Sequence, residues 1–181
     1  MEGLALNLIN VYAPTSSPKQ MRFSQQASAF LGSLDSRECL VLGWDINTTL
    51  KEQDHSGTEQ CPAATHVLRK IVDHHSLVDI WHNHHLDDVS TFTYVWVEAH
   101  RSCNSCLDCI YFSHHQLSQA HSSGIQPALF SDHHLVTEMA SRGRGQSTGT
   151  LITACWKMWA SWRPFGSSGW SGKGRGAPFP S

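Results

Sequence analysis

The sequence of 181 residues lacks an apolar run long enough to span a bilayer, and it lacks a charged start followed by an apolar core and a cleavage site. We therefore expect an intracellular protein, nuclear or cytoplasmic, with no secretory signal and no membrane contact. Disulfides are rare in those compartments, so the six cysteines are expected to be reduced. The sequence also lacks internal repeats, and its length is that of a single domain.

Acidic residues are absent from the last part of the chain. All 15 lie at or before Glu138, whereas six of the 13 Lys and Arg residues and eight of the 13 glycines follow it. The formal net charge of -2 therefore averages two unlike regions. We predict a folded domain over residues 1–140 and a basic, Gly/Ser/Trp-rich tail over 141–181 that is disordered apart from a marginal helix over 151–162.

The apolar pattern of residues 1–140 predicts a layered α/β domain. Nearly continuous apolar sequence over 4–14 is typical of a central strand covered on both faces. Ser17 as N-cap and Gln20 in a capping box predict the start of a helix, and a second amphipathic helix is expected around Ala64–Val72. Further strands are expected over 38–44, 90–97, 107–113 and 133–140, the last of which would end the fold.

Polar residues stand where these predicted strands end. Asp45 and Asn47 follow a buried strand, and at a period of two they would point to the same side, although an Asx-type turn explains the same pair. Strand ends on one rim of a sheet converge in space, so we expect the polar ends to form one site. Acids, an amide, an imidazole and a phenol are groups suited to metal-assisted phosphodiester hydrolysis. The candidates are Tyr12, Asp45, Asn47, Asp108, Asp132 and His133.

Four motifs carry a family resemblance: NVYAP at 10–14, GWDIN at 43–47, SCLDCIYFS at 105–113 and SDHHLV at 131–136. In this order they resemble the later motifs of the endonuclease/exonuclease/phosphatase superfamily. The resemblance is nearest to the apurinic-like endonuclease domain of non-LTR (LINE-type) retrotransposons. It implies a four-layered α/β-sandwich, dependence on Mg²⁺ and nicking of a DNA strand.

The resemblance also implies a role for each matching residue. Tyr12 would contact the scissile phosphate, while Asp45 and Asn47 would orient the attacking water and the phosphate. Asp108 would hold the hydrogen bonds of the site. His133 would handle a proton or stabilise an oxyanion, and its neighbour Asp132, the acid of the same motif, would be a Mg²⁺ ligand.

Three departures from the family pattern bear on activity. In the family, strands that carry a metal-binding Glu precede the tyrosine motif, whereas this sequence begins a few residues before it. We therefore expect an N-terminally truncated endonuclease remnant that is inactive as written. Trp44 replaces a small residue and is expected to crowd the substrate at the active rim. Cys106 and Cys109 stand where basic residues would meet DNA phosphates.

A zinc- or nucleic-acid-binding module without catalysis is the alternative. Cysteines with zinc-type spacing and a cluster of histidines and acids favour zinc, but the apolar residues between the thiols indicate a buried strand. The basic, glycine-rich tail has the composition of disordered RNA-binding segments, or it is unselected sequence. The residues concerned are Cys103, Cys106, Cys109, His82, His84, His85, Asp87 and Asp88.

Overall fold

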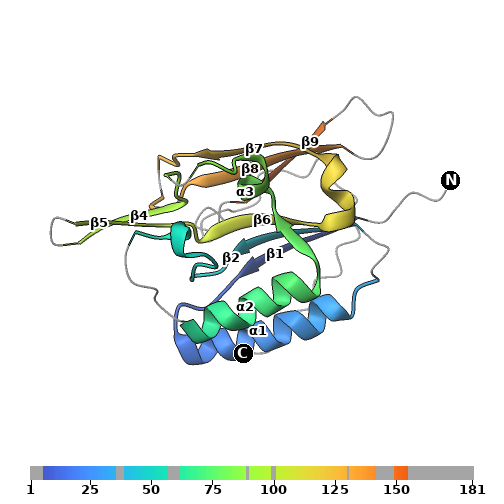
Figure 1. The fold of residues 1–181 in the computed structure, drawn as a ribbon, viewed down its shortest axis with the longest axis horizontal. Helices are drawn as coiled ribbons and strands as arrows, with labels where there is room; N and C mark the ends of the chain where they lie inside the picture. Colours follow the sequence, from blue (N-terminus) through green and yellow to red (C-terminus); the bar gives the residue numbers. More distant parts are fainter. Residues whose placement is uncertain are drawn as a thin grey trace, which may run out of the picture.

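The computed structural model describes residues 6–35, 39–56, 62–88, 90–98, 101–129, 131–141 and 149–154. A four-stranded sheet lies in the middle of the molecule (Figure 1). Two long helices cover one of its faces, a three-stranded sheet covers the other, and a two-stranded hairpin projects to one side. The predicted α/β class is therefore confirmed, with layers in the order helices, sheet and sheet.

The middle sheet has the strand order β1-β2-β6-β3. Strand β1 (Leu6–Tyr12) pairs in parallel with β2 (Cys39–Asp45). Strand β6 (Asp108–Ser113) pairs antiparallel with β2 on one side and with β3 (Leu77–Asp79) on the other. Every residue of β6 is buried, which agrees with the continuous apolar run that predicted this strand.

Strand β1 differs from its prediction as a strand covered on both faces. Among the described strands it pairs only with β2, and the side chains of Leu8 and Tyr12 are 61% and 54% exposed. Ile9 and Val11, on the opposite face, pack against the core. An apolar run shows that side chains can be buried, but the neighbouring elements decide which of them are.

Both predicted helices are present, α1 (Ser17–Gly32) and α2 (Pro62–His74). They cover the face of the middle sheet to which Leu42 of β2 and Tyr111 of β6 point. The buried side chains between helices and sheet include Leu31, Leu42, Leu68, Ile71 and Tyr111. This packing forms the first of two hydrophobic cores and confirms the amphipathic pattern from which the helices were predicted.

The start of α1 differs in detail from its prediction. Ser16, rather than Ser17, is the N-cap residue, and no side chain caps the helix. Gln20 is buried, and its Nε2 donates a hydrogen bond to the carbonyl oxygen of Asn47 at 2.9 Å. A contact with a segment 27 residues away has therefore replaced the predicted local capping box.

Trp44 lies in the first core and not at the rim of a substrate site, so the prediction that it crowds a substrate is wrong. Its side chain is 1% exposed and meets the ring of Phe23 edge-on, with the ring centroids 6.5 Å apart. Side chains alternate along a strand, and Trp44 therefore points away from the face that carries Asp45.

The outer sheet consists of β7 (Ala120–Gln126), β8 (Leu135–Ser141) and β9 (Gly149–Ala154), all antiparallel. Residues 133–140 are therefore not the last strand, and residues 151–154 form a strand rather than the predicted marginal helix. The second core lies between the two sheets and contains Val41, Ile80, Ile110, Phe112, Val136 and Ala140.

The division of the chain at residue 140 stays a prediction. The pairing of β9 with β8 carries the outer sheet past that position. Residues 155–181, with most of the predicted tail and its RNA-binding composition, lie outside the described residues.

Four smaller elements complete the fold. The hairpin of β4 (Tyr94–Glu98) and β5 (Arg101–Ser105) projects from the body (Figure 1). Helix α3 (Ile80–His84) follows β3, and the short 3₁₀ helices are η1 (Glu52–Asp54) and η2 (His114–Gln119). None of the helices that the structure describes combines the length and the apolar character needed to cross a membrane.

Candidate active site

Three neighbouring strands bring three of the predicted site residues into one row. Tyr12 of β1 is the register partner of Asp45 of β2, and Asp45 is the register partner of Asp108 of β6. The two aspartates have the same parity in their strands as Val41 and Ile110 of the second core. The row therefore lies at one end of the middle sheet, on the face that meets the outer sheet.

His133 reaches this row from the segment that precedes β8. Its Nδ1 lies 2.7 Å from Oδ2 of Asp108, to which it donates a hydrogen bond, and 4.0 Å from Oδ2 of Asp45. Ser131 orients the backbone, because its Oγ accepts a hydrogen bond from the amide of His133 at 3.0 Å. The ring of Tyr94 lies against the imidazole, with centroids 4.9 Å apart. Asp45, Asp108 and His133 are called the His133 cluster below.

The cluster is buried and carries excess negative charge. Asp45, Asp108 and His133 are 1%, 2% and 5% exposed. Burial by itself lowers the pKa of His133, but the hydrogen bond with Asp108 and the charges of Asp108 and Asp45 together raise that pKa above its ordinary value. The imidazole is thus biased toward its charged form, which suits a group that faces a phosphate.

The geometry at Asn47 combines the two sequence interpretations. Strand β2 ends at Asp45, whose Oδ1 accepts a hydrogen bond from the amide of Asn47 at 3.1 Å, as in an Asx turn. Asn47 has a φ of 46°, in the left-handed region, and its Nδ2 donates to the carbonyl of Ala13 at 2.6 Å. The period of two therefore does not extend to Asn47. The turn and the site occupy the same residues.

The two remaining candidates lie at the border of the cluster. Tyr12 is half-exposed at the end of β1. Asp132 is exposed, and its charge contributes to the raised pKa of His133, while its carbonyl accepts a hydrogen bond from Val95 at 3.4 Å. All six predicted residues thus lie on four segments that meet at or beside one end of the sheet, although Asp132 is outside the buried group.

The carboxylates of the His133 cluster are suitable ligands for a divalent cation. One ligand atom from each of its three residues lies within 4.8 Å of the others. Oδ1 of Asp108 is buried and has no hydrogen-bond partner among the described residues. Carboxylate oxygens are the ligands that hard divalent cations prefer, and an unpartnered buried one favours a bound ion or a hydrogen-bond donor.

The cysteine and histidine motifs form no second group of this kind within the described part of the chain. Burial raises the pKa of Cys106 to about 12 and that of Cys109 well above its usual range. The Sγ of Cys106 contacts the carbonyl of Thr91 at 3.2 Å.

The role of Thr93 was not predicted from the sequence. This residue makes hydrogen bonds to the two backbone segments that carry the site. Its side chain is 1% exposed, and its hydroxyl accepts hydrogen bonds from the amides of Leu107 and Asp108 at 2.8 and 2.9 Å. Its carbonyl accepts the amide of His134. Thr93 therefore links the two chain segments that carry Asp108 and His133. A threonine in a predicted strand gave no signal for this role.

Comparison with known proteins identifies a relative in a transposon. No protein-family model matches the chain. The transposon TX1 uncharacterized 149 kDa protein of Xenopus laevis is 42% identical over 135 residues, which make up 75% of this chain and 10% of that protein. The chain therefore spans about a tenth of the length of this curated relative.

Solved structures with a similar fold include endonucleases. An AP endonuclease from Archaeoglobus fulgidus superposes with a TM-score of 0.58 over 70% of this chain and 59% of its own. The endonuclease domain of TRAS1, a telomere-specific non-LTR retrotransposon, gives 0.52 over 68% and 52%. The AP endonuclease LMAP from Leishmania major gives 0.54 over 64% and 42%. All three are 15% identical to this chain, and the predicted resemblance is confirmed at the level of the fold.

Proposed function

Given that the chain has the fold of AP endonucleases and of a retrotransposon endonuclease domain, and that it is related to a transposon protein, we propose that it carries the phosphate-binding end of a metal-dependent DNA endonuclease. The observation that supports this proposal most directly is the row of Tyr12, Asp45 and Asp108 with His133 bonded to it. The imidazole, whose pKa is raised, and the buried carboxylates suit hydrolysis of a phosphodiester.

Each residue of the row has a chemical role in this proposal. Asp108 holds Nδ1 of His133, so that Nε2 is the ring nitrogen that meets a phosphate oxygen. The half-exposed hydroxyl of Tyr12 donates to a second phosphate oxygen. Asp45 and Oδ1 of Asp108 would hold a divalent metal ion, Mg²⁺ by the family resemblance. A bound divalent ion neutralises phosphate charge and lowers the pKa of water.

The hairpin of β4 and β5 is the part of the molecule that we assign to DNA beside the site. It begins at Tyr94, whose ring contacts His133, and it projects away from the body (Figure 1). Trp96 and Val97 are 44% and 67% exposed on it. A two-stranded ribbon has the width of a DNA groove, and exposed aromatic side chains can stack on bases.

The chain as given is proposed to nick DNA little or not at all. Both carboxylates of the His133 cluster already accept hydrogen bonds, Asp45 from Asn47 and Asp108 from His133. No glutamate joins the cluster within the described residues. Mg²⁺ dehydrates reluctantly and needs well-placed oxygen ligands, so two partly occupied carboxylates should bind it weakly.

Two measurements on the purified full chain separate the parts of this proposal. Binding of duplex DNA, followed by fluorescence anisotropy with Mg²⁺, should weaken in His133→Ala and remain in His115→Ala, which changes an exposed histidine of η2. Nicking of supercoiled plasmid should stay at background in all three proteins. Nicking that His133→Ala abolishes would show that the site is complete. Absence of DNA binding that depends on His133 would contradict the endonuclease proposal itself.

A further inference from the structure

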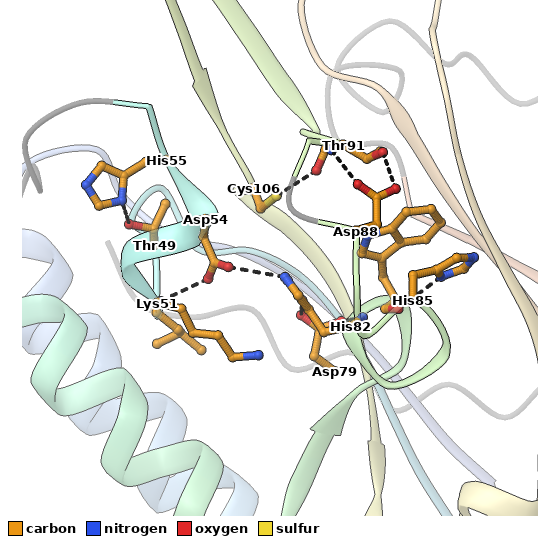
Figure 2. Close-up of polar contacts among 12 residues, drawn as sticks. Thr49, Lys51, Asp54, His55, Asp79, His82, His85, Asp88, Thr91 and Cys106 are labelled. Carbon is orange, nitrogen blue, oxygen red and sulfur yellow. Dashed lines mark hydrogen bonds and ion pairs between the residues drawn. The ribbon is translucent and has the colours of Figure 1, made fainter.

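A second imidazole between two carboxylates lies outside the His133 cluster. Nδ1 of His82 is 2.8 Å from Oδ2 of Asp79, and its Nε2 forms an ion pair at 3.2 Å with Oδ1 of Asp54 (Figure 2). The side chains of His82, Asp79 and Asp54 are only 13%, 15% and 6% exposed, respectively. Asp54, Asp79 and His82 are called the His82 cluster below.

The His82 cluster joins two segments that are far apart in sequence. Asp79 is the N-cap of α3, where its Oδ1 accepts the amide of His82 at 3.4 Å. Asp54 ends η1, and its Oδ2 accepts the amide of Lys51 at 2.9 Å. The hydrogen bonds with Asp54 and Asp79 raise the pKa of His82 to about 9, even though burial lowers it. The imidazole is thus a cation between two anions at neutral pH.

The segment that His82 holds runs beside the chain that leads to Asp108. The carbonyl of Asp54 accepts the amide of Cys106 at 2.8 Å, and the amide of Ser56 donates to Asn104 at 2.9 Å. Two residues after Cys106 the chain reaches Asp108, whose Oδ2 accepts Nδ1 of His133. One continuous path of hydrogen bonds and backbone therefore connects His82 to the His133 cluster.

Removal of the His82 cation would displace the residues along this path. Asp54 and Asp79 would face each other as like charges, and repulsion between buried carboxylates is strong because screening is weak. A pocket of about 320 Å³ borders the cluster, so Asp54 has room to move away. Movement of Asp54 would pull on the amide of Cys106 and shift the backbone of Asp108.

We propose that His82 is a positioning residue, which fixes residues 54–56 and 104–108 so that the carboxylate of Asp108 meets the imidazole of His133. This inference rests on the proposed function for its meaning, because Asp108 and His133 are the groups that would face a phosphate. The geometry that it concerns is nevertheless measurable without DNA or metal.

The test is an NMR measurement on the full chain. The Nδ1 proton of His133 lies in a short hydrogen bond, and its resonance is assigned by its loss in His133→Gln. We expect His82→Gln to shift this resonance toward that of a weak hydrogen bond. Exchange of the Cys106 and Asp108 amides should quicken about tenfold relative to the core amide of Val41. His82→Arg should restore both, because it returns a cation and the adjacent pocket has room for the longer side chain.

A matched control lies on the same helix. His84 bonds through Nδ1 to Ser123 at 3.0 Å, away from the His82 cluster, so His84→Gln should leave both readouts unchanged. If His82→Gln does not fold, Asp79→Asn provides the test, since it keeps an acceptor for His82 but removes one charge, and the same changes should appear in weaker form. An unchanged His133 resonance, with only a lower melting temperature, would reduce His82 to a structural role and overturn the proposal. Failure to bind DNA would contradict the proposed function alone.

Discussion

The His133 cluster and the His82 cluster consist of the same groups, one imidazole and two carboxylates, but they use the imidazole differently. His82 contacts an acid through each ring nitrogen, Asp79 at 2.8 Å and Asp54 at 3.2 Å. His133 faces both of its acids with the same nitrogen, Nδ1, at 2.7 and 4.0 Å. In the first arrangement both ring nitrogens contact acids, whereas in the second both acids lie at Nδ1, which under the proposed function leaves Nε2 for a phosphate oxygen. The two imidazoles therefore differ in the number of ring nitrogens that contact acids, which agrees with the different roles proposed for them.

The carboxylates of the two clusters also differ in their arrangement. In the His82 cluster, Asp54 and Asp79 lie beside different ring nitrogens of one imidazole, so the cation separates the two negative charges. In the His133 cluster, Asp45 and Asp108 are neighbours across two strands. Oδ1 of Asp108 and Oδ1 of Asp54 are both buried without a hydrogen-bond partner in the described part of the chain, but Oδ1 of Asp54 lies in an ion pair with His82. The arrangement in the His133 cluster costs stability in the absence of a ligand, which is common at functional sites.

The largest expected effect is that of removing the His82 imidazole from between its two acids. His82→Leu leaves Asp54 and Asp79 nearly buried without their partner, so the free energy of unfolding should fall by about 3 kcal/mol. Urea denaturation measures this loss. His84→Leu, on the same helix, is the control and should cost clearly less. Equal losses in the two variants would show that the His82 cluster is not a tight charge pair.

The pH dependence of stability should sharpen the comparison. The pKa of His82 is about 9 in the folded chain, above its ordinary value of 6.5. The stabilisation is therefore fully present below pH 6.5 and is lost as the pH rises from 6.5 to 9, by about 2 kcal/mol after allowance for partial exposure. Urea unfolding at several pH values measures the fall. His82→Gln should unfold without this component, and a wild-type profile in that variant would contradict the assignment.

Glu138 is a buried acid outside both clusters, and it provides a reference for the effect of burial alone on pH-dependent stability. It is 0% exposed on β8, Oε1 accepts the amide of His121 at 3.1 Å, and burial raises its pKa from 4.5 to about 7. Stability from the neutral acid is full below pH 4.5 and is lost as the pH rises from 4.5 to 7. Glu138→Gln should therefore stabilise the chain by about 1–2 kcal/mol at pH 8 and change little at pH 4.5. Thermal unfolding at the two pH values tests this, and a loss at pH 8 would contradict it.

The smallest expected effect concerns the His133 cluster. Asp45→Asn removes one of two neighbouring negative charges and keeps an oxygen that can accept the amide of Asn47. We expect a change in unfolding free energy between zero and a gain of about 1 kcal/mol. Chemical denaturation without divalent ions measures it, with Asp54→Asn of the His82 cluster as the destabilising counterpart. A clear loss of unfolding free energy in Asp45→Asn would mean that the charge of Asp45 stabilises the fold, as the charge of Asp54 is expected to do.

Much of the fold and of the candidate site could be predicted from the sequence, because short-range patterns carry it. The period of two and the apolar runs predicted β2 and β6, and the helical spacing predicted α1 and α2. Polar residues at strand ends predicted that Asp45, Asp108 and His133 would meet, and the hydrogen bond between Asp108 and His133 bears out that convergence. Their assignment to catalysis stays a prediction.

The tertiary structure decided which side chains are covered and which distant residues pair. Leu8 and Ile9 are equally apolar, yet one is exposed because no described element lies over it. Trp44 is buried because strand register turns it toward α1, and Asn47 leaves the strand period because its amide folds back onto Asp45. His82 meets Asp54 across 28 positions of sequence, through a loop and a helix whose relative placement no local pattern encodes. Local propensities act over a few residues, whereas charge pairing and burial depend on distances in space that only the packed chain sets.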